Sequence, residues 1–414
     1  MLKFLIGFWF VLCAVVLLAM WPLVKRVFAL ARLTRKGEKA RRFRSIYRYI
    51  TCRDVPASTQ PTPLPDSAQT LVLPETFTTG GQTLNLEQFL IDTGASGMMV
   101  LHRGEVVFEN YEQGMRAGDV QLCFSVTKSI TSTLIGIAVD EGLIDSLDDP
   151  VDKYLSDLKG SGYEGVTLAQ CLEMGSAVDF QEDYENDKPS DMPAFQKHFA
   201  MNKPALAFIR QLQKHPARWP GRFCGYSSMD AQVAGSCLVA VLLQQEKTLS
   251  QYLHEKLWQP LGAQDNAYWL VDGAGVELTA GGLCASVRDL AKFGQLILQR
   301  GRWQGRQLVS ETWLERATTA HAPHLQPGLR DDCLKPWGYG YLWWIPEHQT
   351  GGDYFASGIY NQFVYINPET ELVIAKLGAN EHFNDAPELS KHQYIDAFQA
   401  ISKLVQQGNL GAPK

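Results

Sequence analysis

Segments with strand-like composition lie near both ends of this chain, while the stretch between them is mostly helical in pattern. Residues 98–111 are largely apolar around an Arg103-Gly104 turn, which predicts a β-hairpin. Three later strands and a closing helix are predicted at residues 339–345, 362–367, 371–377 and 386–406. This order predicts an α+β fold, in which both ends of the domain complete one antiparallel sheet beside a helical region.

An uncharged apolar run of 21 residues, from Phe4 to Val24, precedes all of these segments. Such a run is long enough to cross a bilayer as a helix. A cleaved signal peptide is the alternative, but Lys25 and Arg26 intervene before the A-x-A sequence that begins at Ala29. We therefore expect a single-pass N-terminal transmembrane helix at about residues 4–24, and the bacterial inner membrane as the location.

Charge is distributed unevenly along the chain. Residues 1–50 contain eleven Lys or Arg and one Glu, whereas the remainder contains 27 Lys or Arg and 43 Asp or Glu. By the positive-inside rule, the basic residues would keep the rest of the chain cytoplasmic, but they could equally lie along an anionic lipid surface. The membrane face of the domain stays open, and the acidic remainder argues against nucleic acid as a partner.

Shifts in composition divide the chain into three parts. Five prolines within residues 53–75, among Ser, Thr and Gln, predict an extended tether. The expected parts are a transmembrane anchor with its basic segment (1–52), a Pro-rich linker (53–80) and a globular domain (81–414). The eight cysteines contain no C-x-x-C pair, and several occur in apolar runs where a small buried thiol is the ordinary explanation.

Ser125 and Lys128 are three residues apart at the start of an apolar segment, which predicts a buried helix running toward Gly142. Positions i and i+3 share one face of a helix, so the lysine amine can lie over the serine hydroxyl. A lysine whose pKa is lowered by burial can deprotonate that hydroxyl, and the helix N-terminus offers N–H groups to an oxyanion. A Ser-x-x-Lys pattern also occurs by chance, so other segments must support this interpretation.

Two later segments supply that support. Tyr226, with Ser227 and Ser228, follows a Pro-Gly turn and leads into a predicted helix. A tyrosine near a Ser-Lys pair could relay a proton to a leaving group, although a half-buried aromatic is the simpler interpretation of Tyr226 alone. Gly358 precedes a predicted strand, and an edge there could present a backbone N–H to an oxyanion.

The order and spacing of three motifs resemble the serine β-lactamase-like family. The motifs are Ser125-Val126-Thr127-Lys128, Tyr226-Ser227-Ser228 and Ala356-Ser357-Gly358. That family includes class C β-lactamases, D-alanyl-D-alanine peptidases, esterases and 6-aminohexanoate-dimer hydrolases, and the resemblance covers roughly residues 90–405. It implies an α/β sandwich of the β-lactamase/transpeptidase type and a serine hydrolase that uses neither a cofactor nor a metal.

The resemblance also implies a role for each matching residue. Ser125 would be the acylated nucleophile, Lys128 its base and Tyr226 a proton relay. The backbone N–H groups of Ser125 and Ile359 would form the oxyanion hole. The remaining pocket residues would be Ser228, Tyr184, Ala356, Ser357 and Gly358.

Two departures from the β-lactamase pattern narrow the expected substrate. Ser228 stands where β-lactamases have asparagine, and Ala356 stands where they have lysine or histidine. Without that cation, recognition of a β-lactam or D-alanine carboxylate would lose on the order of 2 kcal/mol. The 6-aminohexanoate-dimer hydrolase branch fits better, so we expect an acyl-enzyme mechanism on a small amide or carboxylic ester. A β-lactamase or D-alanyl-D-alanine peptidase is the alternative.

Three other interpretations compete with a serine hydrolase. Asp92-Thr93-Gly94 copies an aspartic-protease signature, but that chemistry needs two carboxylates and the sequence has no second copy. His321 and His324 have a His-x-x-His spacing, but the intervening proline favours a surface loop over a metal site. A non-catalytic penicillin-recognising binding module on the same fold is disfavoured because the Ser, Lys and Tyr are all retained.

Overall fold

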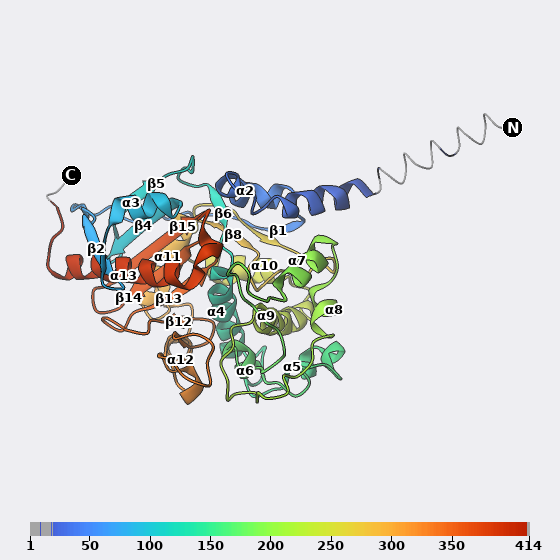
Figure 1. Cartoon of the computed structure of the whole chain (residues 1–414). Coiled ribbons are helices and arrows are strands. Elements are labelled where there is room, and N and C mark those ends of the chain that lie inside the picture. Colours follow the sequence, from blue (N-terminus) through green and yellow to red (C-terminus); the bar gives the residue numbers. More distant parts are fainter. Residues whose placement is uncertain (1–8, 10–17, 19, 412–414) are drawn as a thin grey trace.

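The computed structural model of the chain describes residue 9, residue 18 and residues 20–411 (Figure 1). Most of the run from Phe4 to Val24, which the sequence predicts to be a transmembrane helix, therefore lies outside the described residues. Within the part of the chain that is described, no helix is long and apolar enough to cross a membrane.

The main sheet has seven strands in the order β11-β12-β13-β14-β15-β4-β5, and all of its neighbouring pairs are antiparallel. Its strands are β4 (Ala95–His102), β5 (Glu105–Tyr111), β11 (Gly338–Tyr339), β12 (Trp344–Ile345), β13 (Tyr354–Gly358), β14 (Gln362–Asn367) and β15 (Leu372–Gly378). The late strand β15 pairs with the early strand β4, with Ile374 opposite Val100. This pairing confirms the prediction that both ends of the domain complete one sheet.

Helices cover both faces of the main sheet (Figure 1). They include α3 (Leu86–Asp92), α11 (Val287–Leu298) and α13 (Pro387–Gln406). Phe363 and Val364 are neighbours in β14, so their side chains point to opposite faces. Phe363 packs on Tyr394 of α13, whereas Val364 faces Gly294 of α11. The closing helix predicted from the sequence is therefore one of the two layers that bury the sheet.

A helical region lies beside the sheet, as the sequence predicted. It contains α4 (Val126–Asp140), α5 (Val151–Tyr154), α6 (Leu168–Leu172), α7 (Met192–Ala200), α8 (Ala205–Ile209), α9 (Ser228–Leu243) and α10 (Leu249–Leu253), and α12 (Glu311–Thr318) packs against α4. Helices α4 and α9 are buried along nearly their whole lengths, because most of their residues on every side are apolar or small. Helix α4 also contacts β13 and β14, so it joins the helical region to the sheet.

A second sheet of four strands has the order β1-β7-β8-β6. Its members are β1 (Cys52–Val55), β6 (Val120–Leu122), β7 (Ala267–Leu270) and β8 (Leu283–Ser286), and two short hairpins are formed by β2 (Thr76–Thr79) with β3 (Gln82–Asn85) and by β9 (Arg302–Trp303) with β10 (Arg306–Gln307). Strand β1 begins the stretch that the sequence predicts to be a tether, and it pairs with β7 instead of standing free. The boundary between linker and globular domain at residue 80 stays a prediction.

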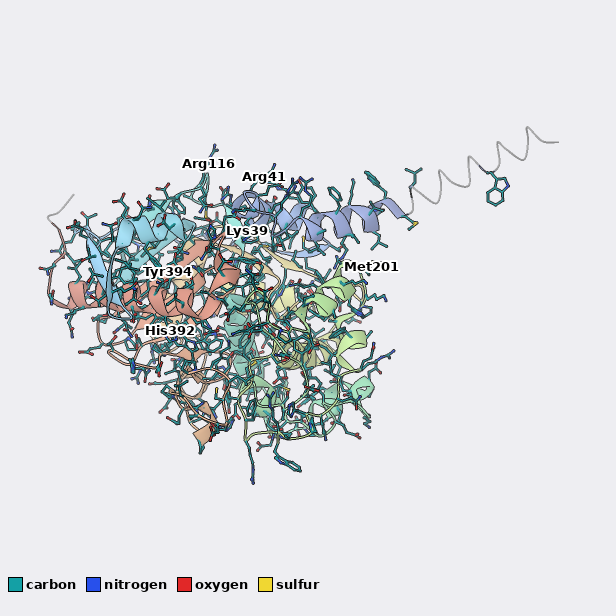
Figure 2. All side chains as sticks on the ribbon, viewed as in Figure 1. Lys39, Arg41, Arg116, Met201, His392 and Tyr394 are labelled. Atoms are coloured by element: carbon teal, nitrogen blue, oxygen red, sulfur yellow. The ribbon has the colours of Figure 1, made fainter. Side chains whose placement is uncertain are left out.

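The basic segment before β1 also packs against the domain. Residues 20–31 are helical and are followed by α2 (Lys39–Ser45) and the short helix η1 (Ile46–Arg48). The guanidinium of Arg26 donates to the carbonyl oxygens of Phe199 and Val271, and the ammonium of Lys39 donates to those of Asn380 and Glu381. Figure 2 shows Lys39 on the inner side of α2 and Arg41 on its outer side. These contacts attach the N-terminal segment to the domain.

Candidate active site

Ser125 lies at the N-terminal end of the buried helix α4, and Lys128 lies one turn further along. The Nζ atom of Lys128 donates hydrogen bonds to Ser125 Oγ at 2.8 Å, to Ser228 Oγ at 3.0 Å and to the carbonyl oxygen of Ala280 at 2.6 Å. The lysine side chain is about 1% exposed. The spacing in the sequence therefore becomes a direct contact between the expected nucleophile and its expected base.

Burial determines the protonation state of this lysine. It disfavours the charged ammonium and lowers the pKa of Lys128 to about 8, while the negative charge of Glu182 opposes the shift. With that pKa, roughly one Lys128 side chain in ten is neutral at pH 7. A neutral amine 2.8 Å from the Ser125 hydroxyl can accept its proton.

Tyr226 lies beside the Ser-Lys pair. Its hydroxyl is within hydrogen-bonding reach of the Ser125 side chain, and its ring centroid is 5.0 Å from Lys128 Nζ. The ring stacks on Trp344 with centroids 5.0 Å apart. Burial, followed by the negative charge of Glu182, raises the pKa of Tyr226 well above its ordinary value. The tyrosine is therefore positioned as a neutral proton donor, and its environment does not favour a phenolate.

The end of β13 passes directly beside the N-terminus of α4. A Cβ atom added to Gly358 would lie 2.5 Å from the carbonyl oxygen of Cys123 and 3.0 Å from the nitrogen of Ser125, so only glycine fits without movement. Ile359 follows this glycine and lines the same cavity as Ser125. This close approach places two chain segments at the spot where an oxyanion hole would form.

Ser228, the first residue of α9, is held by a loop residue to which the sequence assigned no role. The carboxylate of Glu182 accepts hydrogen bonds from the backbone N–H of Ser228 at 2.5 Å, from its hydroxyl at 2.9 Å and from the Tyr184 hydroxyl at 2.5 Å. A carboxylate at a helix N-terminus is stabilised by the free N–H groups and the helix dipole. Glu182 thus joins the loop, Tyr184 and the start of α9 into one unit.

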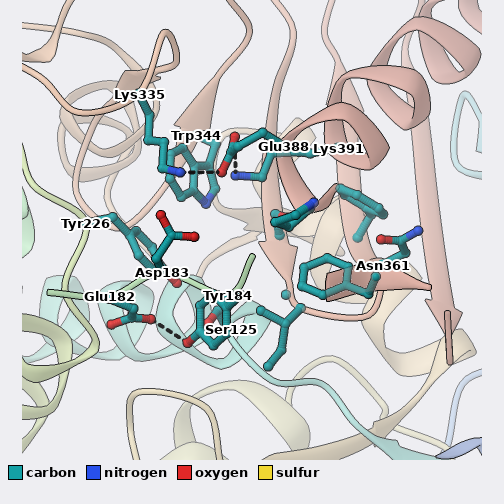
Figure 3. A pocket seen from close by; sticks show the side chains of 16 residues that line it. Ser125, Glu182, Asp183, Tyr184, Tyr226, Lys335, Trp344, Asn361, Glu388 and Lys391 are labelled. Carbon is teal, nitrogen blue, oxygen red and sulfur yellow. Dashed lines mark hydrogen bonds and ion pairs between the residues drawn. The ribbon is translucent and has the colours of Figure 1, made fainter. Parts of the chain in front are cut away.

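The largest group of charges in the pocket consists of Lys335, Glu388 and Lys391 (Figure 3). The carboxylate of Glu388 lies 3.1 Å from Lys335 Nζ and 3.5 Å from Lys391 Nζ. Burial raises the pKa of Glu388, but the two ammonium groups outweigh it and hold this pKa at about 2. The cluster alone has a formal charge of +1, but Glu182 and Asp183 also line the pocket, so its five charged side chains sum to −1. The sequence pattern did not indicate the cluster, because its members come from a loop and from α13.

The expected pocket residues reach the site with one exception. Two cavities meet at Ser125, and between them they are lined by Ser125, Tyr184, Tyr226, Ser228, Ser357, Gly358 and Ile359. Ala356 does not line either cavity, because it is fully buried in the hydrophobic core within β13. Its expected place in the pocket is wrong: neighbouring residues of a strand point to opposite faces.

The residues behind the competing interpretations lie elsewhere. Asp92 ends α3, and Gly94, with φ of +65°, forms the turn into β4, as expected for a segment before the first strand of the sheet. His324 is buried, not in a surface loop as predicted, and both His321 and His324 lie within hydrogen-bonding distance of Glu173. Among the described residues, no group of three or more His, Cys, Asp or Glu side chains could hold a metal ion.

Sequence comparison finds a family and a related protein that match this chain. Residues 85–397 match the family model described as Beta-lactamase. The chain is 30% identical over 303 residues to the 6-aminohexanoate-dimer hydrolase of Paenarthrobacter ureafaciens, an alignment that covers 71% of this chain and 75% of that protein.

Structural comparison shows the fold. A proposed 6-aminohexanoate-dimer hydrolase from Bacillus anthracis has a TM-score of 0.76 at 21% identity, and the match covers 91% of this chain and 96% of that one. A family VIII carboxylesterase has a TM-score of 0.54 at 16% identity, covering 76% of this chain and 96% of that one. These likenesses confirm an α+β fold of the β-lactamase/transpeptidase type with a large antiparallel sheet.

Proposed function

The chain belongs to the beta-lactamase family and is a serine hydrolase, and we propose that it cleaves a small amide or carboxylic ester through an acyl-enzyme on Ser125. The observation that carries this proposal is the contact of Lys128 Nζ with Ser125 Oγ at 2.8 Å, with the Tyr226 hydroxyl at the same serine. Ser125 is thus within reach of both the proposed base and the proposed proton relay before substrate binds.

Acylation would begin with neutral Lys128 taking the proton of Ser125. The serine Oγ then attacks the carbonyl carbon, and the backbone N–H groups of Ser125 and Ile359 stabilise the negative oxygen of the tetrahedral intermediate. The proton passes from Lys128 through the Tyr226 hydroxyl to the departing nitrogen or oxygen. When the bond to that atom breaks, the acyl group remains on Ser125.

Deacylation would reverse these proton transfers with water in place of the leaving group. A water molecule loses its proton to the Tyr226–Lys128 pair and attacks the acyl carbon. The second tetrahedral intermediate uses the same two N–H groups. Its collapse returns the proton to Ser125 Oγ and releases the carboxylic acid, so the cycle needs no cofactor.

The substrate class is supported by the relatives and by the two departures from the β-lactamase pattern. The relative at 30% identity is named a 6-aminohexanoate-dimer hydrolase, and a structural neighbour is a carboxylesterase. Ser228 and Ala356 replace residues that serve β-lactam recognition in class C enzymes.

A fluorophosphonate probe tests the nucleophile directly. The wild type should be labelled, and Ser125→Ala should not. Ser132→Ala is the matched control, because Ser132 lies in the same buried helix and its hydroxyl has no hydrogen-bond partner among the described residues. No labelling of the wild type, or equal labelling of wild type and Ser125→Ala, would overturn the proposal.

A substrate panel tests the chemistry. We expect p-nitrophenyl esters and short amides to be hydrolysed faster than a chromogenic cephalosporin. Turnover of the cephalosporin above that of the esters would show instead that the enzyme is a β-lactamase.

We also propose that the run from Phe4 to Val24 anchors the enzyme in a membrane, as its length and composition support. After cell lysis, the full chain should stay in the membrane fraction through a carbonate wash, and detergent should release it. Recovery of the full-length chain in the soluble fraction would contradict the anchor.

A further inference from the structure

A second cavity, of about 180 Å³, opens at the nucleophile beside the polar pocket of Figure 3. Ser125, Tyr184 and Ile359 line both cavities, so the two spaces meet where the acyl-enzyme would form. A substrate bonded to Ser125 can therefore extend one of its halves into each space.

The two cavities differ in chemistry. The polar pocket is lined by five charged side chains, whereas none of the described residues that line the second cavity is charged. The second cavity is walled mainly by large apolar side chains, including Leu30, Leu33, Leu122, Phe195, Leu270 and Leu278. An apolar wall of this kind repels charged groups and favours hydrocarbon, whose burial releases ordered water.

One wall of this cavity comes from the N-terminal segment. Leu30 lies near the end of the helix that contains Arg26, and Leu33 lies in the turn that follows it. The Arg26 guanidinium donates to the carbonyl oxygen of Phe199 at 3.1 and 3.2 Å. On the other side of the turn, Phe43 packs on the rings of Phe124 and Tyr360, with centroids 4.9 and 5.2 Å apart. The segment is thus held in place at both ends of the wall.

The proton relay shows which half of the substrate faces which cavity. Tyr226 lines the polar pocket and does not line the apolar cavity. The leaving group receives its proton from this tyrosine, so it departs on the polar side. The acyl half, which stays on Ser125, then points toward the apolar cavity.

We propose that the apolar cavity is an acyl pocket, completed by Leu30 and Leu33 of the N-terminal segment, and that the enzyme prefers substrates with an aliphatic acyl chain. This proposal rests on the acyl-enzyme function proposed above. Each methylene group that the cavity buries should raise kcat/KM about fourfold. The hexanoyl ester should therefore exceed the acetyl ester by on the order of 100-fold.

The test compares p-nitrophenyl esters of increasing acyl length with the full-length enzyme. Leu33→Trp should fill the cavity and reduce the hexanoyl-to-acetyl ratio of kcat/KM by about tenfold or more. Leu30→Ala enlarges the cavity and should move the optimum to a longer chain. Leu243→Trp is the matched control, because Leu243 is 57% exposed at the end of α9, and it should keep the wild-type ratio.

Each outcome is informative. A wild type that hydrolyses all chain lengths equally while still reacting with the fluorophosphonate would overturn the acyl pocket and leave the acyl-enzyme intact. A wild type that neither reacts with the probe nor hydrolyses any ester would overturn the proposed function itself. If Leu33→Trp does not fold, the chain-length profiles of the wild type and of Leu30→Ala still test the proposal. An unchanged optimal chain length in Leu30→Ala would show that the N-terminal segment does not form a wall of the acyl pocket.

Discussion

Lys128 Nζ lies 2.8 Å from Ser125 Oγ, and the lysine that reaches it is enclosed by protein along its whole length. Burial removes the hydration of the ammonium and thereby lowers the pKa of Lys128, so part of the side chain is a neutral amine near neutral pH. The proposed catalytic role of Lys128 and the electrostatic cost of its burial therefore have the same structural cause, and both can be measured.

The first prediction concerns the pH dependence of hydrolysis. Only neutral Lys128 can accept the serine proton, and burial sets its pKa at about 8. Below that pH, kcat/KM for an ester should rise roughly tenfold per pH unit, and above it the value should level off. A flat profile between about pH 6 and pH 9 would contradict Lys128 as the base.

Glu182→Gln should change this profile in a specific direction. The negative charge of Glu182 raises the pKa of Lys128, so its removal should move the rising part of the profile to lower pH. The plateau should also fall, because the amide cannot accept hydrogen bonds from both groups of Ser228 and from Tyr184. Glu185→Gln, in the same loop but paired with Lys188, should leave the profile unchanged. A shift to higher pH in Glu182→Gln would refute the electrostatic link.

Gly358→Ala should reduce activity sharply. The new Cβ would meet Cys123 O at 2.5 Å, so β13 must move away from the N-terminus of α4 and carry Ile359 with it. Loss of one oxyanion donor typically costs on the order of 100-fold in kcat or more. Gly175→Ala is the control, because its Cβ would have ordinary contacts, the nearest at 3.5 Å. Full activity of Gly358→Ala, with a normal melting temperature, would rule out this packing as a requirement.

Lys128→Met should reveal the cost of burying the base. The pKa of Lys128 is about 8 in the folded protein and near 10.5 when unfolded, so between these values the unfolded chain binds more protons and the wild type gains stability as pH rises. Methionine has no such dependence. The unfolding free energy of the variant minus that of the wild type should therefore fall by on the order of 3 kcal/mol from about pH 8 to pH 10.5. If the unfolding free energies of the wild type and the variant, measured by denaturant titration, changed equally with pH, the lowered pKa of Lys128 would be contradicted.

The parts of the site that could be predicted from sequence are those fixed by local geometry. Ser125 and Lys128 meet because they are three positions apart at the start of one helix, and that spacing is independent of the rest of the fold. Strands β4, β5, β14 and β15 could be predicted from their composition, and their union into one sheet followed from the general rule for α+β domains. The single strand predicted at residues 339–345 is wrong, because β11 and β12 are two short strands that pair with each other in an antiparallel manner.

The parts that could not be predicted depend on long-range packing. Glu182, Lys335 and Glu388 come from separate loops and a helix end, and a charged residue in such places is usually solvated. The basic N-terminal segment was interpreted through its charge, yet Arg26 and Lys39 bind backbone carbonyl groups of the domain. A charge pattern predicts that Lys and Arg side chains are exposed to solvent, as most of them are. The tertiary fold instead buries Arg26 and Lys39.

The order of synthesis gives the N-terminal wall one more consequence. Leu30 and Leu33 are synthesised early, but Leu270, Ile359 and Tyr360, which line the same cavity, are synthesised much later. At roughly 5–20 residues per second, the nascent chain carries Ser125 and Lys128 for many seconds without these partners. The proposed oxyanion hole of Ser125 and Ile359, and the complete wall of this cavity, can therefore form only after residue 360 has been synthesised.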